Sequence, residues 1–182
     1  MAHISLGNSL PGIQGLLQYR PETGHVLSQL AETLLRADNS LSRGERELIA
    51  AYVSGLNSCT FCHLSHSTFA ALQLENGWTT VDEVMSDPNA ADISPKLRAL
   101  LPIAAQVQIG GRSVTDDQLA AAREAGATDI EIHDTVLIAA AFCMFNRYVD
   151  GLGTFAPPQR EDYEQGGHRI VEFGYLSTHD LP

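Results

Sequence analysis

The chain has 182 residues, of which 44% are hydrophobic and 18% charged, a composition typical of a globular domain and not of a disordered chain, a collagen or a coiled coil. Its 22 Asp and Glu residues outnumber its 11 Lys and Arg residues, so we expect neither nucleic acid nor an anionic membrane as a partner, because both would repel a net charge of −11. No stretch is apolar and long enough to cross a bilayer, and the first ten residues lack a signal-peptide pattern. We therefore expect a cytoplasmic protein whose three cysteines are reduced at rest.

Helical periodicity and capping residues divide the chain into about seven predicted helices. Apolar residues recur at helical spacing in almost every segment and strand-like alternation is scarce, so the predicted fold class is all-α. Capping boxes, in which Ser or Thr is followed by Glu or Gln at the N3 position, begin at Ser42, Thr80, Thr115 and Thr128. The predicted helices cover about 21–36, 42–56, 59–74, 80–88, 94–110, 115–126 and 128–151.

Two flanking segments lack this periodicity. Residues 1–20 mix Gly, Pro and Ser, which predicts an irregular N-terminal arm. Residues from about 154 to 182 contain one Pro-Pro pair and one Gly-Gly pair. This composition predicts a loose tail, or an arm that packs on a neighbouring chain. We therefore expect a single all-α domain over residues 1–182. The similar starts of the helices at Ser42 and Thr128 are compatible with a weak internal duplication.

The reactive side chains gather at the start of the third predicted helix, between Cys59 and His66. Cys59 and Cys62 are three residues apart on one face of a helical turn, where a disulfide could form after modest adjustment. A thiol in the first turn lies at the positive end of the helix dipole, which favours the thiolate. His66 lies one turn beyond Cys62, so its imidazole can take the thiol proton. The third cysteine, Cys143, lies in an apolar run and is expected in the core.

Glu47 is predicted to join these residues through hairpin geometry. If the second and third helices form an antiparallel hairpin hinged at Asn57, Glu47 precedes the hinge by ten residues and His66 follows it by nine. At the rise of an α-helix, both lie about 14 Å from the hinge and can face each other. A buried carboxylate there would fix the tautomer of His66 and raise its basicity. The predicted order is Glu47, His66, Cys62, with Cys59 positioned to close a disulfide.

Three other interpretations compete for the same segment. Zinc is one, because the segment holds four residues of ligand type: Cys59, Cys62, His63 and His66. On one unbroken helix, however, Cys59 and His66 lie about 10 Å apart, too far for ligands of a single ion. Cys59-x-x-Cys62-His63 also matches covalent haem attachment, but that accompanies export and no signal peptide is evident. The third interpretation is structural: small buried thiols in a hairpin. We expect no metal and no cofactor.

Glu47 followed by Cys59-x-x-Cys62-x-x-x-His66 resembles the motif of the AhpD-like alkylhydroperoxidases, within the carboxymuconolactone decarboxylase superfamily. The spacing is fairly specific, whereas the helical framework alone is not. The resemblance extends from roughly residue 10 to residue 173. Two further stretches are similar to its branch of uncharacterised peroxidase-related proteins: residues 41–57 (LSRGERELIAAYVSGLN) and residues 145–153 (FNRYVDGLG).

This resemblance implies an AhpD-like helical fold, a homo-oligomer between a dimer and a hexamer, and a thiol peroxidase or disulfide reductase without haem or metal. By position, Cys62 corresponds to the peroxide-attacking cysteine and Cys59 to the resolving cysteine, while His66 and Glu47 correspond to the proton relay. The best-known members carry a second His between the two cysteines. This chain has Phe61 there and places its extra His at His63 instead.

The function predicted from the sequence is therefore a thiol-dependent peroxidase. Its expected partners are a hydroperoxide substrate and a dithiol or protein reductant, and a disulfide formed between Cys59 and Cys62 would be reduced in each cycle. Two alternatives remain open. One is a lyase of the carboxymuconolactone decarboxylase kind, which would not need the cysteine pair. The other is a non-enzymatic protein whose disulfide alters its assembly.

Overall fold

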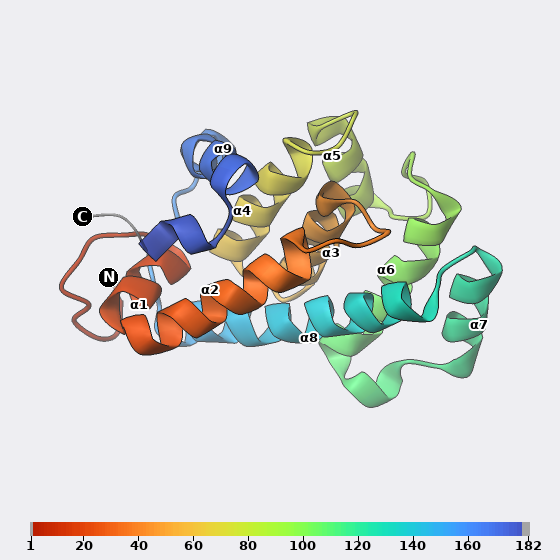
Figure 1. The fold of residues 1–182 in the computed structure, drawn as a ribbon, viewed down its shortest axis with the longest axis horizontal. Coiled ribbons are helices and arrows are strands. Elements are labelled where there is room, and N and C mark those ends of the chain that lie inside the picture. Colours follow the sequence, from red (N-terminus) through yellow and green to blue (C-terminus); the bar gives the residue numbers. More distant parts are fainter. Residues whose placement is uncertain (1, 180–182) are drawn as a thin grey trace.

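The computed structural model describes residues 2–179, in which nine α-helices occur and no strand (Figure 1). This confirms the all-α fold class, with two helices more than predicted. The helices are α1 (Gly12–Tyr19), α2 (Pro21–Arg36), α3 (Arg43–Leu56), α4 (Thr60–Ala71), α5 (Trp78–Ser86), α6 (Pro95–Ile109), α7 (Asp116–Glu124), α8 (Asp129–Gly151) and α9 (Glu164–Phe173). Short 3₁₀ segments are η1 (Gly111–Ser113), η2 (Arg160–Tyr163) and η3 (Leu176–His179).

The core lies between α3, α6 and α8, which pack against one another. The 23-residue α8 runs along one side of the molecule, with α2 crossing over it (Figure 1). Large side chains that are fully enclosed here include Leu48, Ile103, Ile138 and Phe142. Within the described part of the chain, none of the helices combines the length and apolar character needed to span a membrane.

Three of the four predicted capping boxes form both of their hydrogen bonds, at Ser42, Thr115 and Thr128. The box predicted at Thr80 is wrong. Thr80 is buried inside α5, which begins two residues earlier, after Gly77 in a left-handed conformation (φ 53°). The predicted third helix also ends earlier than expected, at Ala71.

The prediction of an irregular arm over residues 1–20 is wrong for Gly12–Tyr19, which form α1. Leu16 is fully enclosed, so tertiary packing stabilises a short helix whose glycines argue against it locally. Gly12 has φ 52° and lies against the Phe61 ring, where an added Cβ would come within 2.2 Å of it. Only glycine fits this approach between α1 and α4.

The C-terminal segment is also more ordered than predicted. It forms α9, which packs against α4 of the same chain, and η3, which packs against α2 (Figure 1). Ile170 is a buried residue of α9. Gly167, also on α9, lies so close to Leu72 that an added Cβ would come within 2.8 Å of the Leu72 side chain. The interpretation of this segment as a loose tail is therefore corrected, because the segment is helical and packs on its own domain. The alternative, an arm that packs on a neighbouring chain, stays a prediction.

Candidate active site

The turn between α3 and α4 determines where the cysteines lie. The amide of Cys59 donates to the Ser54 carbonyl (3.0 Å) and the amide of Ser58 donates to the Gly55 carbonyl (2.9 Å), which is the hydrogen-bond pattern of a Schellman motif. Ser58 takes the left-handed conformation (φ 58°) usually occupied by glycine. This turn reverses the chain and leaves Cys59 as the N-cap of α4. Cys62 consequently lies in the first turn, near the positive end of the helix dipole.

A buried polar network holds this turn in place. The Asn57 side chain donates to Oδ1 of Asn146 on α8 (2.8 Å) and accepts from Gln108 on α6 (2.9 Å). Asn146, which is 1% exposed, donates in turn to Oγ of Ser54 (3.0 Å). Because buried amides must find partners, this network ties the α3–α4 turn to both core helices.

Glu47 and His66 face each other across the hairpin, at the place predicted from the sequence. Glu47 is 1% exposed, and its Oε2 lies 2.6 Å from Nδ1 of His66. An ionised carboxylate can only accept, so Nδ1 carries the proton and Nε2 is the nitrogen left to act as a base.

His66 and Cys62 line one small, mostly apolar cavity of about 60 Å³. The His66 ring is packed edge-on against Phe142, with ring centroids 4.5 Å apart, and against Phe69, at 5.2 Å. Residues of α1, α2, α4 and α8 and of the C-terminal segment complete the walls: Ile13, Leu17, Leu27, Ser28, Ala31, Phe61, Phe142, Phe145 and Tyr175. The site therefore depends on α1 and on the C-terminal segment, the two parts of the chain that the sequence did not predict.

Tyr175 is the site residue that sequence reasoning missed. Its hydroxyl donates to the other oxygen of Glu47, Oε1, at 2.6 Å. Its ring is stacked on that of His66, with an interplanar angle of 17° and centroids 6.3 Å apart. The residue lies in the segment interpreted as a loose tail, 128 positions from Glu47, and no local pattern marks it.

Cys59 differs from Cys62 in its surroundings. A hydrogen bond to Cys62, together with burial, raises the pKa of the Cys59 thiol far above its ordinary value. Cys59 therefore stays protonated at neutral pH, and its thiol can donate to the sulfur of Cys62. Both cysteines are buried and carry free thiols. Cys59 borders a second hollow, of about 530 Å³, that is separate from the cavity of His66. His63 and Tyr52 also line this second hollow.

Comparison with known proteins assigns the chain to a family. The model of the carboxymuconolactone decarboxylase family matches residues 21–86 and again residues 73–155. The chain belongs to this family. The two matches contain the helices at Ser42 and at Thr128, whose similar starts suggested a duplication, and the cysteines of the pair lie in the first match.

Solved structures of similar proteins resemble this family member closely in fold. An uncharacterized peroxidase-related protein from Ralstonia eutropha JMP134, described as an alkylhydroperoxidase AhpD core, is 29% identical with a TM-score of 0.75, over 85% of this chain and 80% of that one. An uncharacterized peroxidase-related protein from Silicibacter sp. TM1040 is 21% identical with a TM-score of 0.75, over 85% of this chain and 78% of that one. A search among curated proteins finds no match.

His63, the histidine that departs from the pattern of the best-known AhpD-like members, lies outside the Cys62 cavity. Its Nδ1 donates to the carbonyl oxygen of Ala51 on α3 (3.2 Å), so it joins the two helices of the hairpin. The helix rotates His63 away from Cys62, as its position one residue later requires. It lines the Cys59 hollow instead.

The four residues considered as zinc ligands do not line one common site. Cys59 and His63 border one hollow, while Cys62 and His66 border the other cavity. Helix α4 continues unbroken through the segment. Over residues 2–179, no group of three or more His, Cys, Asp or Glu side chains is arranged to hold a metal ion.

Proposed function

We propose that this member of the carboxymuconolactone decarboxylase family is a thiol-dependent peroxidase that reduces hydroperoxides through Cys62. The observation that carries the proposal is the single cavity shared by Cys62 and His66, in which His66 is held through Nδ1 by the buried Glu47. A nucleophilic thiol, a base and a group that orients the base form the set that activates a cysteine. The peroxidase-related description of the R. eutropha protein, at 29% identity, supports the same reaction class.

In the first step His66 takes the proton of Cys62 on Nε2. The thiolate attacks the terminal oxygen of the hydroperoxide, an S–O bond forms and the O–O bond breaks. The leaving alkoxide receives the proton from His66 and departs as an alcohol. Cys62 is thereby oxidised to a sulfenic acid and the hydroperoxide is reduced, with Glu47 stabilising the transient imidazolium.

In the second step the protonated Cys59 thiol condenses with the sulfenic acid. The Cys59–Cys62 disulfide forms and water leaves, taking the Cys59 hydrogen. An external dithiol then reduces the disulfide by thiol–disulfide exchange and is itself oxidised, which restores both thiols. Cys59 borders a hollow that is separate from the peroxide cavity.

The size and lining of the Cys62 cavity favour a small, uncharged hydroperoxide. A cavity of about 150 Å³ admits benzene, so the 60 Å³ found here suits hydrogen peroxide or a short alkyl hydroperoxide. The described residues that line it include no Lys or Arg. A carboxylated lactone, the substrate type of the lyase alternative, would enter this cavity with unpaired negative charge, which is costly.

Peroxide consumption by the purified chain, with several dithiols as reductants, tests the proposal. We expect turnover in the wild type and its loss in Cys62→Ser. In Cys59→Ser we expect one equivalent of peroxide to react, without turnover, because the sulfenic acid cannot be resolved. Cys143→Ser is the matched control, since Cys143 lies outside the cavity, and it should turn over like the wild type.

Mass spectrometry of the oxidised chain gives an independent readout. After mild peroxide treatment, the peptide that contains Cys59 and Cys62 should lose two hydrogens. If the disulfide forms but peroxide is not turned over with any dithiol, the non-enzymatic alternative replaces the peroxidase. If neither occurs and Cys143 is the main oxidised residue, the assignment of the cysteine pair is wrong.

A further inference from the structure

We infer that Tyr175, in the segment after α9, is a positioning residue that holds the Glu47 carboxylate in the geometry required by His66. The inference rests on the proposed function, because it assigns a role within the same site. Glu47 has two oxygens in an almost fully enclosed environment. His66 satisfies one of them and the Tyr175 hydroxyl satisfies the other, each at 2.6 Å.

The Tyr175 hydroxyl is suited to donate permanently. Burial of the phenol, followed by the adjacent Glu47 charge, raises the pKa of Tyr175 well above its ordinary value. The phenol therefore stays protonated at any pH at which the protein would work. Further charged groups that act on the phenol include Arg36, which lowers its pKa, and Glu32, which raises it, both from α2. The bond orients the carboxylate, and the stacked ring borders the Cys62 cavity.

Hydrogen bonds to α2 anchor the chain around Tyr175 and direct its ring toward Glu47. The amide of Tyr175 donates to Oε2 of Glu32 (2.7 Å). Arg36, paired with Glu32 (3.1 Å), donates to the carbonyls of Ile170 and Val171 at the end of α9.

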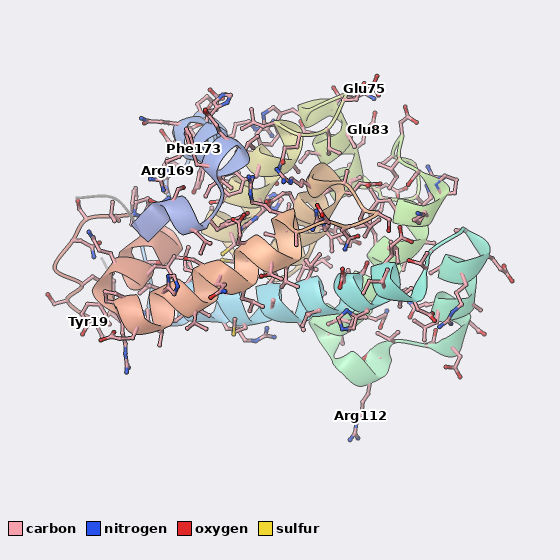
Figure 2. The ribbon with its side chains drawn as sticks, in the orientation of Figure 1. Tyr19, Glu75, Glu83, Arg112, Arg169 and Phe173 are labelled. Carbon is pink, nitrogen blue, oxygen red and sulfur yellow. The ribbon has the colours of Figure 1, made fainter. Side chains whose placement is uncertain are left out.

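The direction of the chain changes at Gly174, which separates an outward side chain from an inward one. Phe173 is the last residue of α9 (Figure 2), and its side chain is 62% exposed. Gly174 has φ 82°, and a Cβ there would come within 2.4 Å of the Glu32 carboxylate. A glycine is therefore required at the point where the chain turns back toward Glu47.

Removal of the hydroxyl alone, in Tyr175→Phe, tests the role while keeping the ring. The buried Oε1 of Glu47 would lose its partner, which disfavours the ionised carboxylate and weakens His66 as a base. We expect peroxide consumption near neutral pH to fall about ten-fold or more, as expected for a hydrogen bond to a charged group. The pH profile should move to higher pH, and the loss should shrink where solvent deprotonates the thiol.

Tyr163→Phe is the matched control. Tyr163 is also buried, but its hydroxyl donates to the carbonyl of Pro157 (2.8 Å) and not to the relay. Its pH profile should keep the wild-type position. In a Glu47→Gln background, Tyr175→Phe should add little, because the carboxylate that Tyr175 holds is gone. An unshifted profile in Tyr175→Phe, or an equal further loss in the Glu47→Gln background, would overturn the inference.

The pH dependence of Cys62 alkylation by iodoacetamide, followed by mass spectrometry, separates this inference from the proposed function. Alkylation requires the thiolate but no peroxidase activity. If the wild type consumes no peroxide, the proposed function fails, and Tyr175→Phe should still shift the alkylation profile to higher pH. An unchanged alkylation profile in Tyr175→Phe would refute the role of Tyr175 whatever the outcome with peroxide.

Discussion

Glu47 is the residue on which the candidate site converges. It receives hydrogen bonds from α4 through His66 and from the C-terminal segment through Tyr175, while its own backbone belongs to α3. A carboxylate this deeply enclosed is stable only when both of its oxygens are paired. The two partners thus satisfy both oxygens of Glu47 within the core.

Glu47→Gln should test the relay at the residue scale. An amide cannot stabilise an imidazolium as a carboxylate does, so peroxide reaction near neutral pH should slow by about 10²–10⁴-fold, the usual worth of general-base assistance. The loss should shrink at high pH, where solvent deprotonates the thiol. Stopped-flow measurement of the first turnover across pH gives both quantities.

His66→Ala should show the same pH-dependent loss as Glu47→Gln. The double variant should be little slower than either single variant, because residues that act as a unit are not additive. Additive losses, or a wild-type pH profile in Glu47→Gln, would remove the relay and leave only the cysteine pair.

At the scale of elements, Glu131 joins α8 to α6 and to the loop between α2 and α3. It is the N3 residue of the α8 capping box, and its fully buried carboxylate also accepts from Lys96 on α6 (2.7 Å) and from Ser40 before α3 (2.8 Å). Burial alone would raise the pKa of Glu131, but the hydrogen bonds from Lys96, Thr128 and Ser40 outweigh it and lower the pKa to about 2.

Glu131→Gln should therefore change the acid stability of the fold. A carboxyl group with a lowered pKa stabilises the folded state above its unfolded pKa, and this contribution disappears as the pH falls through its folded value. The wild type should thus lose stability between about pH 4.5 and pH 2. Glu131→Gln should cost about 3 kcal/mol at neutral pH and flatten this part of the curve.

Urea unfolding at several pH values measures this effect. Glu45→Gln provides the control, because Glu45 occupies the same capping position in α3 but accepts only from the Ser42 amide at the surface. It should cost at most about 1 kcal/mol, as helix-capping changes usually do. Equal losses in the two variants would show that Glu131 acts as an ordinary cap and not as a joint between α6 and α8.

For the whole molecule, the ordered C-terminal segment changes the argument for assembly. The sequence predicted a loose tail or an arm on a neighbouring chain, and the structure shows that the segment packs on its own site. Large apolar side chains nevertheless remain exposed, among them Val26 (63%), Ile109 (71%) and Phe155 (60%). Val26 and Met144, which is 43% exposed, border a mostly apolar hollow between α2 and α8, and contiguous apolar surface of this kind is typical of faces that associate.

We predict that the chain forms a homo-oligomer in solution. Light scattering at micromolar concentration should give at least twice the 19.7 kDa of one chain. The variant Val26→Glu, at an exposed position on α2, is compared with the wild type. A charge on an associating face should lower the mass measured by light scattering, while the helical content stays constant. A mass of one chain for the wild type would contradict the prediction.

The sequence by itself determined the features that depend on neighbouring residues. Helical periodicity, the capping boxes at Ser42 and Thr128, and the placement of Cys62 and His66 one turn apart all arise within a few residues of one another. The facing of Glu47 and His66 was also predictable, because a short turn between two helices leaves little freedom in their register.

Only the tertiary structure decided the features that depend on contacts between distant segments. Helix α1 forms because Leu16 is buried against the rest of the chain, although the local sequence disfavours a helix there. Tyr175 reaches Glu47 because Glu32 and Arg36 on α2 hold the end of α9 and the following turn. Such contacts are favourable only once the intervening helices are packed, so no local pattern of residues records them.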